Sequence, residues 1–134
     1  GPPSQRLPLA DRGGVVMEEP KGDGDCYYVA LLLVADMSDE SGHLLCHGTC
    51  TGNGPIEGIE FGHAWVEYGN VCIDKANGKN GVFEKSVYYE AGTVRDVRRY
   101  KPSEVRRMMR KHKHAGPWDE PAPSPLNAMF SAKR

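Results

Sequence analysis

The chain has 134 residues, of which 39% are hydrophobic and 26% charged, a composition typical of one globular domain. No apolar run approaches the 18 or so residues that a membrane-spanning helix needs, so we expect no membrane protein. The composition also excludes collagen, coiled-coil and wholly disordered chains.

The net charge of −1 conceals an uneven distribution along the chain. Residues 95–114 contain nine basic and two acidic residues, a net charge of +7, and the remainder of the chain carries −8. This stretch is interpreted either as a solvated helix face or as a surface that steers an acidic partner.

Both ends of the chain are rich in proline and polar residues. Residues 1–14 are predicted to form a flexible N-terminal arm and residues 119–134 a flexible C-terminal tail. The single domain is therefore expected to cover residues 15–118.

Within this domain, Asp25 is a suitable N-cap for a helix over residues 26–36, CYYVALLLVAD. Because this helix is apolar on every side, it should be central and buried. Gly69-Asn70 is a two-residue hairpin signal, and Pro102 begins a basic surface helix that ends near His114. The predicted strands are residues 43–50, 62–68, 71–74, 82–90 and 93–100. The order predicts an α+β domain with an antiparallel sheet.

The four cysteines are Cys26, Cys46, Cys50 and Cys72. On one face of a strand, Cys46 and Cys50 would lie roughly 13 Å apart, too far for a disulfide. His47 lies between them and suggests zinc, but no complete ligand set with the usual spacing can be assembled. We therefore expect reduced thiols in a cytosolic protein that has no metal or cofactor.

Cys26 falls in the first turn of the predicted helix, directly after a glycine-rich loop. A helix N-terminus favours a thiolate and presents backbone N–H groups to a developing oxyanion. Asp23 and Asp25 oppose thiolate formation, so a cationic partner is needed.

His63 can supply this cation. If Gly69 and Asn70 form the turn, Tyr68 pairs with Val71, and the pairing extends so that Trp65 faces Asp74.

On this register His63, Trp65, Cys72 and Asp74 share one face of the hairpin. Asp74 is then a diagonal neighbour of His63, at about 7 Å between backbones. Its carboxylate can hold one imidazole nitrogen while the other nitrogen faces a thiol. The candidate catalytic residues are thus Cys26 as nucleophile, His63 as general base and Asp74 as the residue that orients it.

The cysteine at the start of a helix, the strand His63-Ala-Trp-Val-Glu67 and the following Val71-Cys-Ile-Asp74 resemble the transglutaminase-like branch of the papain-like cysteine enzymes. The resemblance covers about residues 22–100. It implies a papain/transglutaminase-like fold, the same three catalytic roles, and a small phage or bacterial protein. Papain itself has a glutamine before the cysteine as an oxyanion donor, and Pro20 stands at that spacing here.

Several of these residues have structural alternatives. Cys26 can be a small buried hydrophobe, and His63 a strand histidine with a satisfied hydrogen bond. Cys72 is a rival nucleophile, although a strand centre lacks unpaired amide donors. Trp65 is expected to pack beside the site and, with Asn53 from the glycine-rich loop, to contact the substrate.

The resulting hypothesis is a cysteine-dependent acyl-transfer enzyme that acts on a protein or peptide. Protease, amidase, deamidase and transglutaminase reactions share the same first half-reaction. One alternative is a non-catalytic binding module of the same fold that contacts an acidic protein or nucleic acid through residues 95–114; another is a structural zinc protein. We expect a monomer in the cytoplasm of a bacterium or of a phage-infected host.

Overall fold

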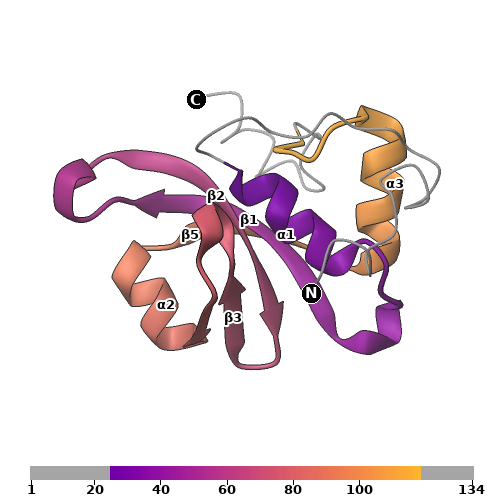
Figure 1. The fold of residues 1–134 in the computed structure, drawn as a ribbon, viewed down its shortest axis with the longest axis horizontal. Helices are drawn as coiled ribbons and strands as arrows, with labels where there is room; N and C mark the ends of the chain where they lie inside the picture. Colours follow the sequence, from indigo (N-terminus) through magenta and orange to yellow (C-terminus); the bar gives the residue numbers. More distant parts are fainter. Residues whose placement is uncertain (1–24, 119–134) are drawn as a thin grey trace.

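The computed structural model describes residues 25–118, which form a five-stranded antiparallel sheet and three α-helices (Figure 1). The helices are α1 (Cys26–Val34), α2 (Lys85–Gly92) and α3 (Pro102–His112). The strands are β1 (His43–Thr51), β2 (Glu60–Tyr68), β3 (Val71–Asp74), β4 (Gly81–Glu84) and β5 (Arg95–Tyr100), in the spatial order β4-β3-β2-β1-β5. Three short 3₁₀ turns are η3 (Asp39–Ser41), η4 (Gly54–Ile56) and η5 (Ala76–Gly78). The predicted α+β class is confirmed. The predicted terminal arm and tail lie outside the described residues, as do residues 15–24.

The sheet is the middle of three layers (Figure 1). On one face, α1 and α3 pack against Leu45, Ala64 and Val66 and bury the larger core. On the other face, α2 covers a smaller core around Trp65 and the three strand cysteines. Residues of α1 are buried or half-buried throughout, which confirms the predicted central helix.

The β2–β3 hairpin has the register predicted from its Gly69-Asn70 turn. Tyr68 pairs with Val71, and Val66 pairs with Ile73. This register places the side chains of alternate β2 residues, including His63, on the same face as Asp74.

The second half of the predicted strand 82–90 is wrong. Only Gly81–Glu84 is extended, and Lys85–Gly92 forms α2. The sequence Val87-Tyr88-Tyr89 has a high β-propensity, but helical packing on the sheet turns both tyrosines toward the second core. The helix ends at Gly92, followed by Thr93 in the left-handed conformation at φ 46°.

This helix also changes the interpretation of β2. Its alternating sequence predicts a strand with one face in water, but Ala64, Trp65, Val66 and Glu67 are all buried. Because α1 covers one face and α2 the other, even the carboxylate of Glu67 is enclosed.

The basic helix predicted to begin at Pro102 is present as α3, and it is amphipathic. Val105, Met108 and Met109 are buried against the sheet side, and Arg107 and Arg110 are exposed. No helix within residues 25–118 is long and apolar enough to span a membrane.

Candidate active site

Cys26 is the first residue of α1 and is 9% exposed. The preceding Asp25 occupies the N-cap position, but its side chain does not cap the helix. Its Oδ1 instead accepts a hydrogen bond from the Asn77 backbone N–H at 2.9 Å. Because Asn77 lies three residues after Asp74, this bond connects the start of α1 to the segment that carries Asp74.

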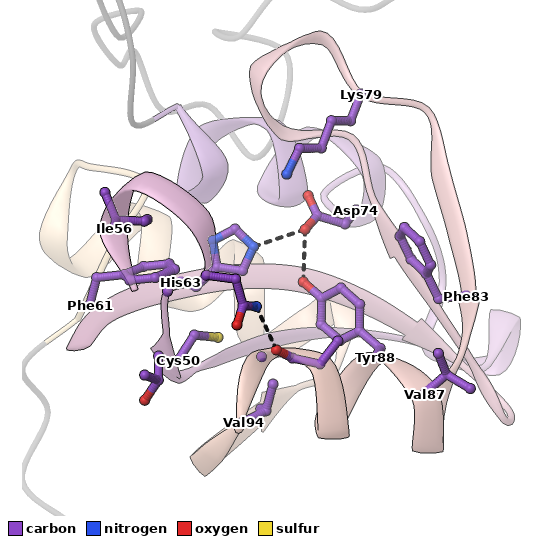
Figure 2. Close-up of a pocket in the computed structure, with 15 residues that line it drawn as sticks. Cys50, Ile56, Phe61, His63, Asp74, Lys79, Phe83, Val87, Tyr88 and Val94 are labelled. Carbon is purple, nitrogen blue, oxygen red and sulfur yellow. Dashed lines mark hydrogen bonds and ion pairs between the residues drawn. The ribbon is translucent and has the colours of Figure 1, made fainter. Parts of the chain in front are cut away.

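His63 and Asp74 form the centre of the site (Figure 2). The Nε2 atom of His63 lies 2.9 Å from Oδ2 of Asp74, and both side chains are largely buried. With Nε2 engaged, Nδ1 is the ring nitrogen left to face a thiol. The predicted diagonal contact across the hairpin is therefore present.

The charges of this pair are set by their surroundings. Burial disfavours the imidazolium, but the hydrogen bond to Asp74 and the nearby Cys26 outweigh it and raise the pKa of His63 to about 9. Burial likewise opposes ionisation of Asp74, yet the donors around it lower its pKa to about 2. At neutral pH the site therefore holds an imidazolium between a carboxylate and a cysteine.

Tyr88 of α2 is a further site residue, which the sequence analysis missed. Its hydroxyl donates to Oδ2 of Asp74 at 2.8 Å, and the Ala76 backbone N–H donates to Oδ1 at 3.0 Å. Burial and the Asp74 charge raise the pKa of Tyr88 well above its usual value, so the hydroxyl remains a donor. Asp74 thus has three donors that fix both of its oxygens.

Trp65 is fully buried and does not line the pocket beside the site, so the structure does not support its predicted contact with substrate. Its indole stacks near the His63 ring, with ring centroids 6.1 Å apart and planes inclined by 23°. Gly48 on β1 makes room for this indole, because a Cβ there would come within 2.7 Å of it. Trp65 therefore supports the histidine.

Glu67 is a buried acid, also missed, that anchors this support. It accepts a hydrogen bond from Trp65 Nε1 at 3.0 Å and pairs with Arg99 at 2.9 Å and Lys85 at 3.3 Å. Burial opposes its charge, but hydrogen bonds from Tyr89, Arg99 and Trp65 prevail and lower its pKa to about 2. Glu67 belongs to the strand motif, but its charged partners come from α2 and β5.

All four cysteines carry thiols without disulfides. Burial raises the pKa of Cys50 to about 11 and that of Cys72 to about 12, and it raises the pKa of Cys46 further. Cys72 lies against Glu67, with Sγ 4.0 Å from its carboxylate. This acidic neighbour disfavours a thiolate and weakens Cys72 as the rival nucleophile.

His47 lies on the opposite face of the sheet, among the rings of Tyr27, Tyr100 and Trp118. Burial lowers its pKa to about 3, so it is neutral. Among residues 25–118, no three histidine, cysteine or acidic side chains are grouped closely enough to hold a metal ion.

A pocket of about 430 Å³ adjoins the His63–Asp74 pair (Figure 2). It lies between the η4 turn, the end of β3 and helix α2. Asn53 lines it, and its Nδ2 donates to the Ala91 carbonyl at 2.8 Å. This bond joins the glycine-rich loop to α2 at the edge of the pocket.

Three arginines of the basic stretch are held by contacts within the fold. Arg95 pairs with Glu60, and Arg99 pairs with the buried Glu67. Arg106 donates to the carbonyls of Ala35 and Met37 after α1, at 3.1 and 2.7 Å. Part of the +7 charge therefore stabilises the fold.

Searches with this chain match no family model, no curated protein and no solved structure.

Proposed function

We propose that the protein is a cysteine-dependent acyl-transfer enzyme in which Cys26 is the nucleophile, His63 the acid and base, and Asp74 the residue that orients His63. The single observation that carries the proposal is the 2.9 Å contact of His63 Nε2 with Asp74 Oδ2, on an imidazole whose pKa Cys26 also raises. A nucleophile, a base and an orienting group in hydrogen-bond reach are the signature of such enzymes.

The proposed reaction begins with a Cys26 thiolate beside the His63 imidazolium. The sulfur attacks the carbonyl carbon of an amide or ester, and the carbonyl π electrons move to oxygen. As the oxyanion collapses, the bond to the leaving group breaks and the proton of His63 Nδ1 passes to that group. A thioester on Cys26 remains, and His63 is neutral.

Water or an amine then attacks this thioester, and His63 takes the proton of the attacking group. The thiolate leaves, and the imidazolium is restored. Hydrolysis and amine transfer differ only in this second nucleophile, so protease, amidase, deamidase and transglutaminase activities share the mechanism.

We assign the backbone N–H of Cys26 to the oxyanion. It lies at the start of a nine-residue helix, where the helix dipole favours negative charge. Asp25 does not occupy the amides of this first turn, since its carboxylate bonds to Asn77 instead.

The fold is proposed to be papain/transglutaminase-like. In support, a buried helix bears the cysteine, and the histidine and acid lie on adjacent antiparallel strands, β2 and β3. A protein or peptide is the proposed substrate.

Acylation by p-nitrophenyl acetate tests the proposal directly. We expect a burst of p-nitrophenol and one acetyl group on the peptide that contains Cys26, both lost in Cys26→Ser and His63→Ala. Cys72→Ser is the matched control and should keep the burst. An acetyl group on another cysteine, or no burst in a folded protein, contradicts the proposal and favours a non-catalytic module.

A further inference from the structure

Large apolar side chains line the pocket beside His63 and Asp74 and are exposed to water there (Figure 2). Ile56, Phe83 and Val87 line it, and they are 48%, 39% and 54% exposed. They come from three separate elements, η4, β4 and α2, and meet around one concavity. Large apolar side chains gathered around a pocket mark a ligand site, because water contact there costs free energy that a ligand recovers.

The volume and depth of the pocket suit a small organic ligand. About 430 Å³ lies in the lower part of the range of ligand pockets. Phe61 and Val94 extend the apolar lining inward, and the Asn53–Ala91 hydrogen bond closes one edge. His63 lines the pocket, and Cys26 does not.

The pocket has few charged groups, and they differ in whether their charge is paired. Asp74 is enclosed and has three donors, and His63 is its charged partner, so this pair presents little net charge. Lys79 is exposed at the mouth, and its side chain extends toward Asp74 (Figure 2). Within residues 25–118 it pairs with no acid, so its ammonium group is open to an anionic partner.

We infer that this pocket binds a carboxylate that carries an apolar chain or ring, with the apolar part against Ile56, Phe83 and Val87 and the carboxylate at Lys79. The C-terminal apolar residue of a peptide and a fatty acyl carboxylate share this chemistry. The role of this ligand as part of the substrate rests on the proposed function, but its binding to the pocket does not.

The experiment is calorimetric titration of Cys26→Ala protein, which cannot turn a ligand over, with hexanoate and octanoate. Octanamide is the uncharged comparator, and N-acetylphenylalanine represents a peptide end. We expect affinity to rise about fourfold for each added methylene. Octanoate should bind more tightly than octanamide, and Lys79→Gln should remove this preference. Tighter binding of octanoate would identify a fatty acyl carboxylate as the ligand, and tighter binding of N-acetylphenylalanine would identify a peptide C-terminus.

The chain offers matched controls of the same residue types. Ile59 and Val82 are 55% and 64% exposed but do not line the pocket. Ile56→Asp and Val87→Asp should each weaken octanoate binding by at least about tenfold, and Ile59→Asp and Val82→Asp should change it by less than about twofold. Equal losses in both sets, or affinity independent of chain length, would overturn the inference. Selective binding in a protein whose Cys26 is not acylated would leave the pocket standing and refute only the proposed function.

Discussion

Asp74→Asn is the most informative change in the site because it removes one charge and keeps the size of the side chain. In the structure, Oδ2 of Asp74 accepts from both His63 and Tyr88, and Oδ1 accepts from the Ala76 backbone N–H. An amide has only one accepting oxygen. Its NH₂ group must therefore face either the Ala76 N–H or the His63–Tyr88 pair.

The effect of Asp74→Asn on the acylation rate depends on how far the His63 imidazole is protonated. With a pKa of about 9, this imidazole is about 99% protonated at pH 7. Without the Asp74 charge, the pKa of His63 should fall, because burial opposes the imidazolium and only Cys26 is left to favour it, so a smaller fraction of the imidazole is protonated at pH 7. We expect acylation of Cys26 to slow by roughly 10- to 10⁴-fold. Asp74→Ala should be slower still, because His63 then loses its anchor.

The assay is NMR titration of the labelled His63 ring, together with the rate of the acetylation burst. Asp39→Asn is the matched control, since Asp39 also accepts two hydrogen bonds, from the Ser103 N–H and hydroxyl at 2.8 and 2.7 Å, in a different part of the fold. An unchanged His63 pKa in folded Asp74→Asn would refute the reasoning. So would an equal loss of rate in Asp39→Asn.

The same pair makes stability depend on pH. His63 has a folded pKa of about 9, above its ordinary 6.5, so its contribution is complete below pH 6.5 and is lost as pH rises through 9. Asp74 has a folded pKa of about 2, below its ordinary 3.8, so its contribution is lost as pH falls from 3.8 toward 2. Denaturant unfolding should therefore show a decline between pH 6.5 and 9 that is absent in Asp74→Asn.

Three other changes test the surroundings of the site. Tyr88→Phe removes one of the donors to Asp74 and should lower the free energy of unfolding by about 1.5 kcal/mol, measured by denaturant titration. Glu67→Gln removes the buried carboxylate that pairs with the partly exposed Lys85 and Arg99, and it should lower the free energy of unfolding by about 2 kcal/mol. A cost under about 0.5 kcal/mol would show that these ion pairs do not stabilise the fold. Reversal of the exposed Arg107 and Arg110 to Glu should change stability by less than about 0.5 kcal/mol and leave the acetylation burst intact, and a large loss of the burst would place α3 in the site.

The contact between His63 and Asp74 could be predicted because it depends on local rules. A two-residue Gly69-Asn70 turn fixes the hairpin register, and the register fixes which side chains share a face. Cys26 could be placed at a helix start for a similar reason, since Asp25 and the apolar run after it signal where α1 begins.

The other half of the site could not be predicted in this way, because it depends on contacts distant in sequence. The high β-propensity of Val87-Tyr88-Tyr89 conceals α2, and without α2 there is no donor from Tyr88 to Asp74. The pattern of β2 likewise places Glu67 in water. Its burial depends on Lys85, Tyr89 and Arg99, which come from elements later in the chain.

The most direct test of the central claim is the rate at which iodoacetamide labels each cysteine near pH 6, followed by mass spectrometry. An imidazolium beside a thiol at a helix N-terminus favours the reactive thiolate, whereas burial raises the pKa of Cys46, Cys50 and Cys72. We expect Cys26 to be labelled at least about tenfold faster than the other three cysteines, and His63→Ala to abolish this difference. Labelling of Cys26 at the same rate as the others, or fast labelling that persists in His63→Ala, would contradict this expectation.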